Sequence, residues 1–293
     1  ALVRDERVLL TCFNEPLADQ IKAYMFEDER LVTGPFLKLA MELCGLSPDS
    51  DLAGLSAAAT KDYWDIDVVG HLHREWPNIE ERFDTIIVDE AQDFSPAWIA
   101  QLESLLDPDG PRRIMLVGDA GQDVFDRGFQ SPRADDGWTV CELVNNSRNS
   151  IQIAQILRRV LLGAPAPMVG PESLGVEFVD VTGQSVVEAV RSAVTIVTPG
   201  GLQLVGKTAV IASNQELRDQ LRRELGFGTW EERDEKIVCE SVRRLKGTEF
   251  DTVILVDDRE EFDQQKLYVG VSRAVSQLIV IGPTSLGEQL GLI

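Results

Sequence analysis

Two adjacent carboxylates follow a run of β-branched apolar residues in the segment 83–94, FDTIIVDEAQDF. The run is typical of a buried strand, and Asp89 and Glu90 stand where that strand would end. In an open parallel α/β sheet, this end of a strand lies at the crevice where ligands bind. One carboxylate there suits Mg²⁺ bound to nucleotide phosphates, and a second can orient or deprotonate a water. The pair indicates phosphoryl transfer, although a helix-capping acidic turn would show the same two residues.

Later segments supply further groups suited to the same chemistry. The candidates are Gln122, Arg148, Lys246, Gly247, Glu249 and Arg273. A neutral amide can sense a γ-phosphate without adding charge. Two arginines that face two carboxylates and a glutamine meet the needs of phosphoryl transfer, because its catalysis is mostly charge stabilisation and positioning.

These side chains must be positioned by strands that alternate with helices. Strands are expected at 7–13, 85–90, 113–119, 138–144, 175–181, 208–213, 251–258 and 276–282. Helices are expected at 15–26, 34–45, 95–106, 150–162, 184–194 and 214–225. Such alternation predicts parallel sheets covered on both faces. We therefore expect an α/β protein of two domains, 1–147 and 148–293, with a helical insertion at about 30–80.

Composition is typical of a soluble globular protein: 44% of the 293 residues are hydrophobic and 26% are charged. No apolar run approaches the length of a membrane span, so no membrane partner is expected. The four cysteines are far apart and form no CxxC pair, which favours a reduced, cytoplasmic setting. His71 and His73 have no second ligand pair nearby and do not indicate a metal site.

The net charge of −21 bears on nucleic-acid binding. A protein that holds nucleic acid through phosphate contacts usually shows a basic surface. Here such a surface would have to be local, built from patches such as Arg222–Arg223 and Arg243–Arg244–Lys246. The charge therefore argues mildly against strong nonspecific DNA binding.

Taken in chain order, these segments resemble the motifs of the UvrD/Rep-like superfamily 1 DNA helicases. LLTCFN resembles motif Ia, VDEAQD motif II and VGDAGQDVF motif III. NNSRNS is similar to the motif IV pattern Asn-Tyr-Arg-Ser, LKGTEFD to motif V and YVGVSRA to motif VI. The resemblance covers residues 8–275, and it implies two RecA-like parallel-sheet domains, the first truncated at its N-terminus.

The resemblance also implies roles for particular residues. Asp89 would bind Mg²⁺. Gly247 and Glu249 would bind ATP, with Glu249 at the ribose. Catalysis would be carried by Glu90, which would activate water, by Gln122, and by the arginine fingers Arg148 and Arg273. Single-stranded DNA (or RNA) would lie near Phe13, Asn14, Phe125 and Arg243, since an aromatic ring can stack on a base. Core packing is the alternative for Phe125.

The chain departs from the family pattern at several points. Ser147 stands where the family has a tyrosine that stacks on adenine, and Arg243 replaces a histidine. Motifs IV and V are too close in sequence to enclose a large accessory subdomain. A Walker A loop would precede motif Ia, so we expect a P-loop-bearing upstream segment of the same protein to complete the site. Without that loop, the isolated fragment is expected to be inactive.

One stretch, GLQLVGKT at 201–208, does match the pattern G-x4-G-K-T. Its interior is bulky where a backbone must wrap a phosphate, and TAVIASN reads better as a strand that ends at a helix cap. We interpret it as a chance match. A permuted P-loop enzyme that depends on Lys207 is the remaining possibility.

The predicted function is ATP-dependent translocation on and unwinding of DNA by a superfamily 1 helicase. The alternative is a non-hydrolysing, helicase-like nucleic-acid-binding or regulatory module. Glu90, Arg148 and Arg273 favour the enzyme, because a module that no longer hydrolyses ATP has no need of them. The missing loop and the negative charge favour the module.

Overall fold

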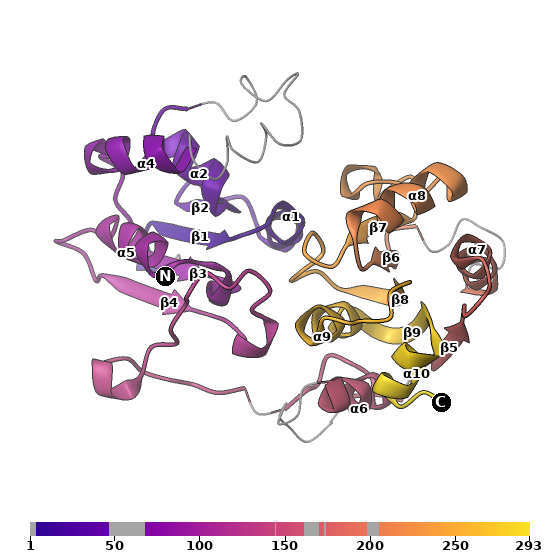
Figure 1. Ribbon diagram of the computed structural model, residues 1–293. Coiled ribbons are helices and arrows are strands. Elements are labelled where there is room, and N and C mark those ends of the chain that lie inside the picture. The colour runs from indigo at the N-terminus through magenta and orange to yellow at the C-terminus, as the bar shows by residue number, and fades with distance from the viewer. Residues whose placement is uncertain (1–3, 47–67, 144, 161–169, 173, 198–204) are drawn as a thin grey trace. The chain divides into compact units, whose positions relative to one another are not determined.

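The computed structural model describes residues 4–46, 68–143, 145–160, 170–172, 174–197 and 205–293 (Figure 1). The chain forms two compact units: Ala1–Asp119 with Phe125–Ser131, and Ala120–Val124 with Pro132–Ile293. In the described residues, each unit contains one sheet, and all strand pairs in both sheets are parallel. The predicted fold class, α/β with two parallel-sheet domains, is confirmed.

The sheet of the first unit has the strand order β2-β1-β3-β4. Its strands are β1 (Val8–Cys12), β2 (Leu31–Pro35), β3 (Thr85–Val88) and β4 (Arg113–Leu116). The helices around it are α1 (Glu15–Tyr24), α2 (Phe36–Leu43), α4 (Val69–Glu75) and α5 (Pro96–Ser104). The register pairs Thr11 with Val88, so β1 and β3 end level with each other. The residues that follow these two strands are thereby brought to the same edge of the sheet.

The core of the first unit is rich in aromatic rings. Phe36 on α2 and Phe94 before α5 are fully buried, with ring centroids 5.3 Å apart. Burying a phenylalanine side chain of this kind stabilises a fold by about 1.5–3 kcal/mol. Helix α5 begins as its sequence predicts, with the Ser95 hydroxyl accepting a hydrogen bond from the Trp98 N–H and Pro96 in the first turn. This packing fixes the loop that leads from β3 into α5.

The sheet of the second unit has the strand order β5-β9-β8-β6-β7. Its strands are β5 (Gly175–Asp180), β6 (Thr208–Ala212), β7 (Val238–Ser241), β8 (Phe250–Val256) and β9 (Ala274–Gly282). The helices are α6 (Ile151–Val160), α7 (Val186–Val197), α8 (Gln215–Leu225), α9 (Gln264–Ser272) and α10 (Thr284–Leu290). Central strands β6 and β8 are almost entirely buried and apolar, as expected for strands covered on both faces.

The structure corrects the predicted elements at three places. The strand predicted at 138–144 is wrong: the described residues 138–143 form neither strand nor helix, and Leu143 is 89% exposed. An alternating pattern needs a neighbouring strand to pair with, and none of the described strands pairs with this segment. Conversely, β2 and β7 form where the sequence pattern predicts no strand. The predicted helical insertion at about 30–80 falls partly at 47–67, outside the described residues.

None of the described helices is both long enough and apolar enough to cross a membrane.

Candidate functional site

The two carboxylates lie directly after β3, in a turn that their own contacts hold. The Asp89 N–H donates to the Thr11 carbonyl at the end of β1 (2.8 Å). The Glu90 N–H donates to Asp89 Oδ1 (2.9 Å). Glu90 has a φ of 52°, in the left-handed region that non-glycine residues seldom occupy. The turn thus places Asp89 and Glu90 on the carboxyl edge of the sheet, where ligands of parallel α/β folds bind.

Gln92 joins this turn to the end of the neighbouring strand β4. Its amide nitrogen donates to Glu90 Oε2 (2.5 Å), and its Oε1 accepts a hydrogen bond from the Asp119 N–H (3.1 Å). The side chain is 1% exposed. The sequence pattern does not single out Gln92, although an amide next to two carboxylates is a signal that could have identified it.

Gly118 lies against this glutamine. A Cβ at position 118 would stand 2.5 Å from Gln92 Oε1, closer than real Cβ contacts come. A side chain at position 118 would therefore push Gln92 away from Glu90 and Asp119. The glycine is needed for close approach rather than for an unusual backbone angle.

The donor set at this edge fits one kind of metal ion. No group of three or more His, Cys, Asp or Glu side chains in the described residues could hold a metal by itself. Mg²⁺ usually binds one or two carboxylates together with substrate phosphates and waters, rather than a cage made only of protein. Asp89, at a strand end with Oδ1 turned to the backbone of Glu90, fits such a partial site.

Cys12 ends β1 beside the same carboxylates. Burial raises the pKa of its thiol well above the usual range, and the negative charges of Asp89 and Glu90 raise it further. Burial likewise raises the pKa of Cys239 to about 12. Both thiols therefore stay protonated at neutral pH, and since the thiolate is the reactive form, neither is suited to act as a nucleophile.

This protonation leads to a first prediction. At about pH 8, iodoacetamide should alkylate the exposed Cys141 at least about a hundredfold faster than Cys12 and Cys239, because the latter two are buried and their thiols stay protonated. Mass spectrometry of proteolytic peptides over time gives the three rates. In urea the rates should converge. Equal rates for Cys12 and Cys141 in the folded protein would contradict the burial of Cys12.

Gln122 and Arg273 form a hydrogen-bonded pair in the second unit. Arg273 directly follows α9, and its side chain is fully buried. Its guanidinium donates to the Val269 carbonyl (3.0 Å), the Thr248 carbonyl (3.1 Å) and Gln122 Oε1 (2.9 Å). These acceptors are neutral oxygens. They fix the direction of the guanidinium.

Arg148 and Glu249 form a second pair in the same unit. The Arg148 Nε lies 2.6 Å from Glu249 Oε1, with side-chain exposures of 48% and 42%. Gly247, two residues earlier, has a φ of 83°. Glycine adopts this angle without the steric cost that a Cβ would bring. The structure thus brings together two residues for which the sequence suggested separate roles, one at the γ-phosphate and one at the ribose.

The residues predicted to lie near DNA divide into three environments. Phe13 stacks with the Trp98 ring (centroids 6.1 Å apart) and meets Phe125 edge-on (4.8 Å). Asn14 caps α1, its side chain accepting a hydrogen bond from the Leu17 N–H (2.9 Å). Arg243 is exposed between β7 and β8. The rings of Phe13, Trp98 and Phe125 form a ring cluster that is packed together but partly exposed. Asn14 has a structural role as the N-cap of α1.

Arg127 completes the ring cluster. Its guanidinium carbon lies 4.0 Å from the Phe13 ring centroid, 4.6 Å from that of Trp98 and 5.1 Å from that of Phe125. The Arg127 Nη1 also donates to the Asp93 carbonyl (3.1 Å). Sequence reasoning missed both Trp98 and Arg127, because nothing in their local sequence shows that they meet Phe13.

Lys207, the lysine of the GLQLVGKT stretch, directly precedes a strand. Residues 201–204 of that stretch lie outside the described residues. Thr208 begins strand β6, whereas a P-loop lysine begins a helix. The strand ends at Ala212, and the side chain of Asn214 caps α8 by accepting a hydrogen bond from the Leu217 N–H (2.9 Å). The side chain of Lys207 is 64% exposed and lies 3.9 Å from Asp251. These features support the interpretation of GLQLVGKT as a chance match.

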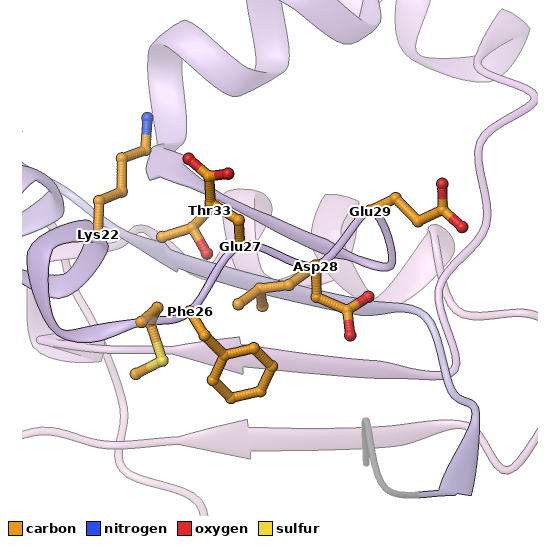
Figure 2. Close-up of a pocket in the computed structure, with 8 residues that line it drawn as sticks. Lys22, Phe26, Glu27, Asp28, Glu29 and Thr33 are labelled. Atoms are coloured by element: carbon orange, nitrogen blue, oxygen red, sulfur yellow. The ribbon is translucent and has the colours of Figure 1, made fainter.

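A cavity of about 530 Å³ opens beside the C-terminal end of α1 and the β2 strand (Figure 2). None of the candidate residues lines it. Its wall includes Phe26, Lys22 and Asp28, which are labelled in Figure 2. Hydrogen bonds from Arg30 hold the pKa of Asp28 at about 2. Three of its eight lining residues are acidic and one is basic, so the hollow does not suit a nucleotide, and the cavity is separate from the candidate site.

The family model for the UvrD-like helicase C-terminal domain matches residues 236–281. The resemblance to superfamily 1 helicases is thereby confirmed for the C-terminal part of the chain. No curated protein matches the chain.

Two solved structures of helicases are among those similar to the chain. The structure of PRRSV helicase is 13% identical, with a TM-score of 0.48, and the match covers 95% of this chain and 47% of that one. The C-terminal domain of a possible DNA helicase from Lactobacillus plantarum WCFS1 is 20% identical, with a TM-score of 0.38, over 49% of this chain and 91% of that one. The chain thus spans about half the length of the PRRSV helicase.

The segment that matches the UvrD-like helicase domain contains most of the second-unit candidates. It runs from just before β7 through β8 and α9 into β9. The candidate residues inside it are Arg243, Gly247, Glu249 and Arg273. Arg148 and Gln122 lie outside the matched segment, but each contacts a residue within it.

Proposed function

We propose that the chain forms part of an ATP-driven superfamily 1 helicase that translocates on single-stranded DNA and unwinds duplexes. The observation that carries the proposal is the environment of Arg273. It lies inside the segment that matches the UvrD-like helicase domain, and it is fully buried. Hydrogen bonds to the Val269 carbonyl, the Thr248 carbonyl and Gln122 Oε1 hold the guanidinium in one direction. An arginine held in this way suits the stabilisation of charge that develops on a transferring phosphoryl group.

The first unit would supply the groups that act on metal and water. Asp89 would hold Mg²⁺, which when bound neutralises phosphate charge. Glu90 would orient the attacking water and accept its proton, and Gln92 would hold Glu90 through the 2.5 Å hydrogen bond. The carboxylates need no further protein partner for these roles.

The second unit would supply the two arginine fingers and the residues beside them. In the described structure Arg148 is ion-paired with Glu249, and both side chains are about half exposed. An exposed ion pair of this kind contributes only about 0–1 kcal/mol, so a nucleotide phosphate can take Arg148 from Glu249 at small cost. Glu249 would then be available to the ribose hydroxyls. Gln122, through Arg273, would relay the state of the γ-phosphate.

Single-stranded DNA would bind at the ring cluster of the first unit. Phe13 and Phe125 are partly exposed, and Arg127 adds positive charge beside their rings. Stacking of a base on an aromatic ring is worth roughly 1–3 kcal/mol and tolerates any base. Such a local site is compatible with the overall charge of −21, because it depends on stacking more than on phosphate contacts.

The phosphate loop would come from a P-loop-bearing upstream segment of the same protein. Within the described residues β4 pairs on one side only, with β3. Met115 on β4 is 56% exposed and Val117 just after it is 38% exposed. An edge of this kind can accept a further parallel strand, which supports the proposal.

The division of the chain into domains at 147/148 stays a prediction.

The test is ATP hydrolysis with and without that segment. The 293-residue chain alone should hydrolyse ATP at background rate, because backbone amides that cradle the phosphates are missing from it. The longer protein should show hydrolysis stimulated by single-stranded DNA. Measurable DNA-stimulated turnover by the chain alone, abolished by Glu90→Gln, would contradict this arrangement. A longer protein that binds DNA and ATP without turnover would favour the non-hydrolysing module, the alternative to which the net charge also points.

A further inference from the structure

Asn149 makes contacts that set it apart from its neighbours in the loop before α6. It directly follows Arg148 but is only 4% exposed. Its amide nitrogen donates to the Ser272 carbonyl (3.1 Å) and to the Ala274 carbonyl (2.7 Å). These carbonyls belong to the residues on either side of Arg273. A side chain adjacent to one proposed arginine finger therefore holds the backbone of the other.

The chemistry of a carboxamide suits this double contact. An asparagine NH₂ group has two hydrogens, one for each carbonyl, and its oxygen accepts a third hydrogen bond from Asn146 Nδ2 (3.0 Å). Asn146 Oδ1 in turn accepts from the Asn149 N–H (3.2 Å). The loop and the junction between α9 and β9 are further joined by the Ser150 N–H, which donates to the Val275 carbonyl (3.0 Å). The two segments are thus fixed in one register.

We propose that Asn149 is a positioning residue that holds Arg273 in place relative to Arg148, so that both guanidiniums can reach the same phosphoryl group. This inference rests on the proposed function. The motif IV pattern that the segment resembles has serine at this place. A hydroxyl has one hydrogen and cannot donate to both carbonyls, so the double contact depends on the asparagine that this chain has.

A residue that only anchors the loop would behave differently from one that positions the fingers. Loss of an anchor lowers the stability of the protein, and it lowers hydrolysis by the same factor whether or not Arg273 is present. Loss of positioning lowers kcat, because the fingers act on charge that grows in the transition state, and leaves the KM for ATP unchanged. Its effect disappears once Arg273 itself is gone.

The experiment compares Asn149→Ala, Asn149→Ser and the control Asn145→Ala in the longer protein that carries the P-loop. Asn145 is an exposed asparagine of the same loop. Asn149→Ala should lower kcat about ten- to a hundredfold with KM within about twofold, since small misplacements of catalytic groups cost rates of this order. Asn149→Ser should lose less, and Asn145→Ala should behave as the parent. In an Arg273→Ala background, Asn149→Ala should cost no more than about twofold.

A spectroscopic readout on the 293-residue chain tests the same inference without turnover. The Arg273 Nε–H donates to the Val269 carbonyl and is buried, so its NMR signal should exchange slowly with solvent. Asn149→Ala should shift this signal and speed its exchange, whereas Asn145→Ala should not.

The outcomes separate the two levels of the proposal. If Arg273→Ala leaves hydrolysis unchanged, the proposed function fails, and with it the purpose assigned to Asn149. If Arg273→Ala is crippling but Asn149→Ala matches the Asn145→Ala control in kcat and in the Arg273 signal, the positioning role alone is overturned. An equal loss in the presence and absence of Arg273, together with a lower urea midpoint, would make Asn149 an ordinary anchor and would also overturn it.

Discussion

Arg273→Ala should lower DNA-stimulated ATP hydrolysis by the longer protein about a thousandfold or more, whereas Lys207→Ala should leave it nearly unchanged. Arginine fingers contribute on this scale because they stabilise charge that develops on the phosphoryl group. Arg273 is buried and aimed by neutral acceptors, whereas Lys207 is largely exposed in a turn before β6. Removing such a surface charge should change the free energy of unfolding by no more than about 0.5 kcal/mol.

The measurement is steady-state hydrolysis with saturating single-stranded DNA, together with binding of a fluorescent nucleotide. Because Arg273 is fully buried, its removal leaves carbonyls without donors, and Arg273→Lys serves as a second variant that keeps the charge. A lysine cannot reproduce the planar fork, so this variant should remain strongly impaired while folding normally. If Lys207→Ala abolished nucleotide binding and Arg273→Ala turned over normally, the helicase assignment would fail and GLQLVGKT would be the true phosphate loop.

Glu90→Gln should lower kcat of the longer protein on the order of a hundredfold or more, with nucleotide binding preserved. The exchange removes a base that would act on water and keeps the shape of the side chain. The Gln92 amide that donates to Glu90 Oε2 can donate equally to a glutamine oxygen, so the turn should keep its structure.

Two measurements check this second result. Single-turnover hydrolysis reports the chemical step, and titration with a fluorescent ATP analogue reports binding. Glu103→Gln is the matched control, because this substitution makes the same charge change on helix α5, away from the end of β3. An unchanged kcat in Glu90→Gln would show that Glu90 takes no part in hydrolysis.

How much of the fold could be predicted from the sequence depended on the type of strand. The buried central strands are runs of β-branched residues, and their positions were predicted to within a few residues. Strand β2 was missed because it contains Gly34 and Pro35, which seldom occur in strands but are tolerated at the edge of a sheet. The segment 138–144 shows the reverse error: alternation predicts a face to bury, but pairing depends on a partner that local sequence does not specify.

The residues of the candidate site also differ in how far the sequence predicts their positions and contacts. Asp89 and Glu90 could be placed at a strand end because their position follows from local pattern. The contacts of Gln92, Trp98, Arg127 and Asn149 could not be predicted, since each joins segments that are far apart in the chain. Asn149 and the Ala274 carbonyl, for example, are separated by 125 positions. The residue type limits which hydrogen bonds and ring contacts each side chain can make, but the fold determines its partners.

The left-handed backbone of Glu90 has a consequence for how the site would work. A non-glycine residue in this conformation costs roughly 1–2 kcal/mol, which the surrounding contacts must offset. A glycine at this position would relieve that strain but would have no carboxylate, so some stability is given up for a fixed acidic group. Because the turn and Gln92 already set the direction of the carboxylate, Glu90 would need little reorganisation when a water arrives.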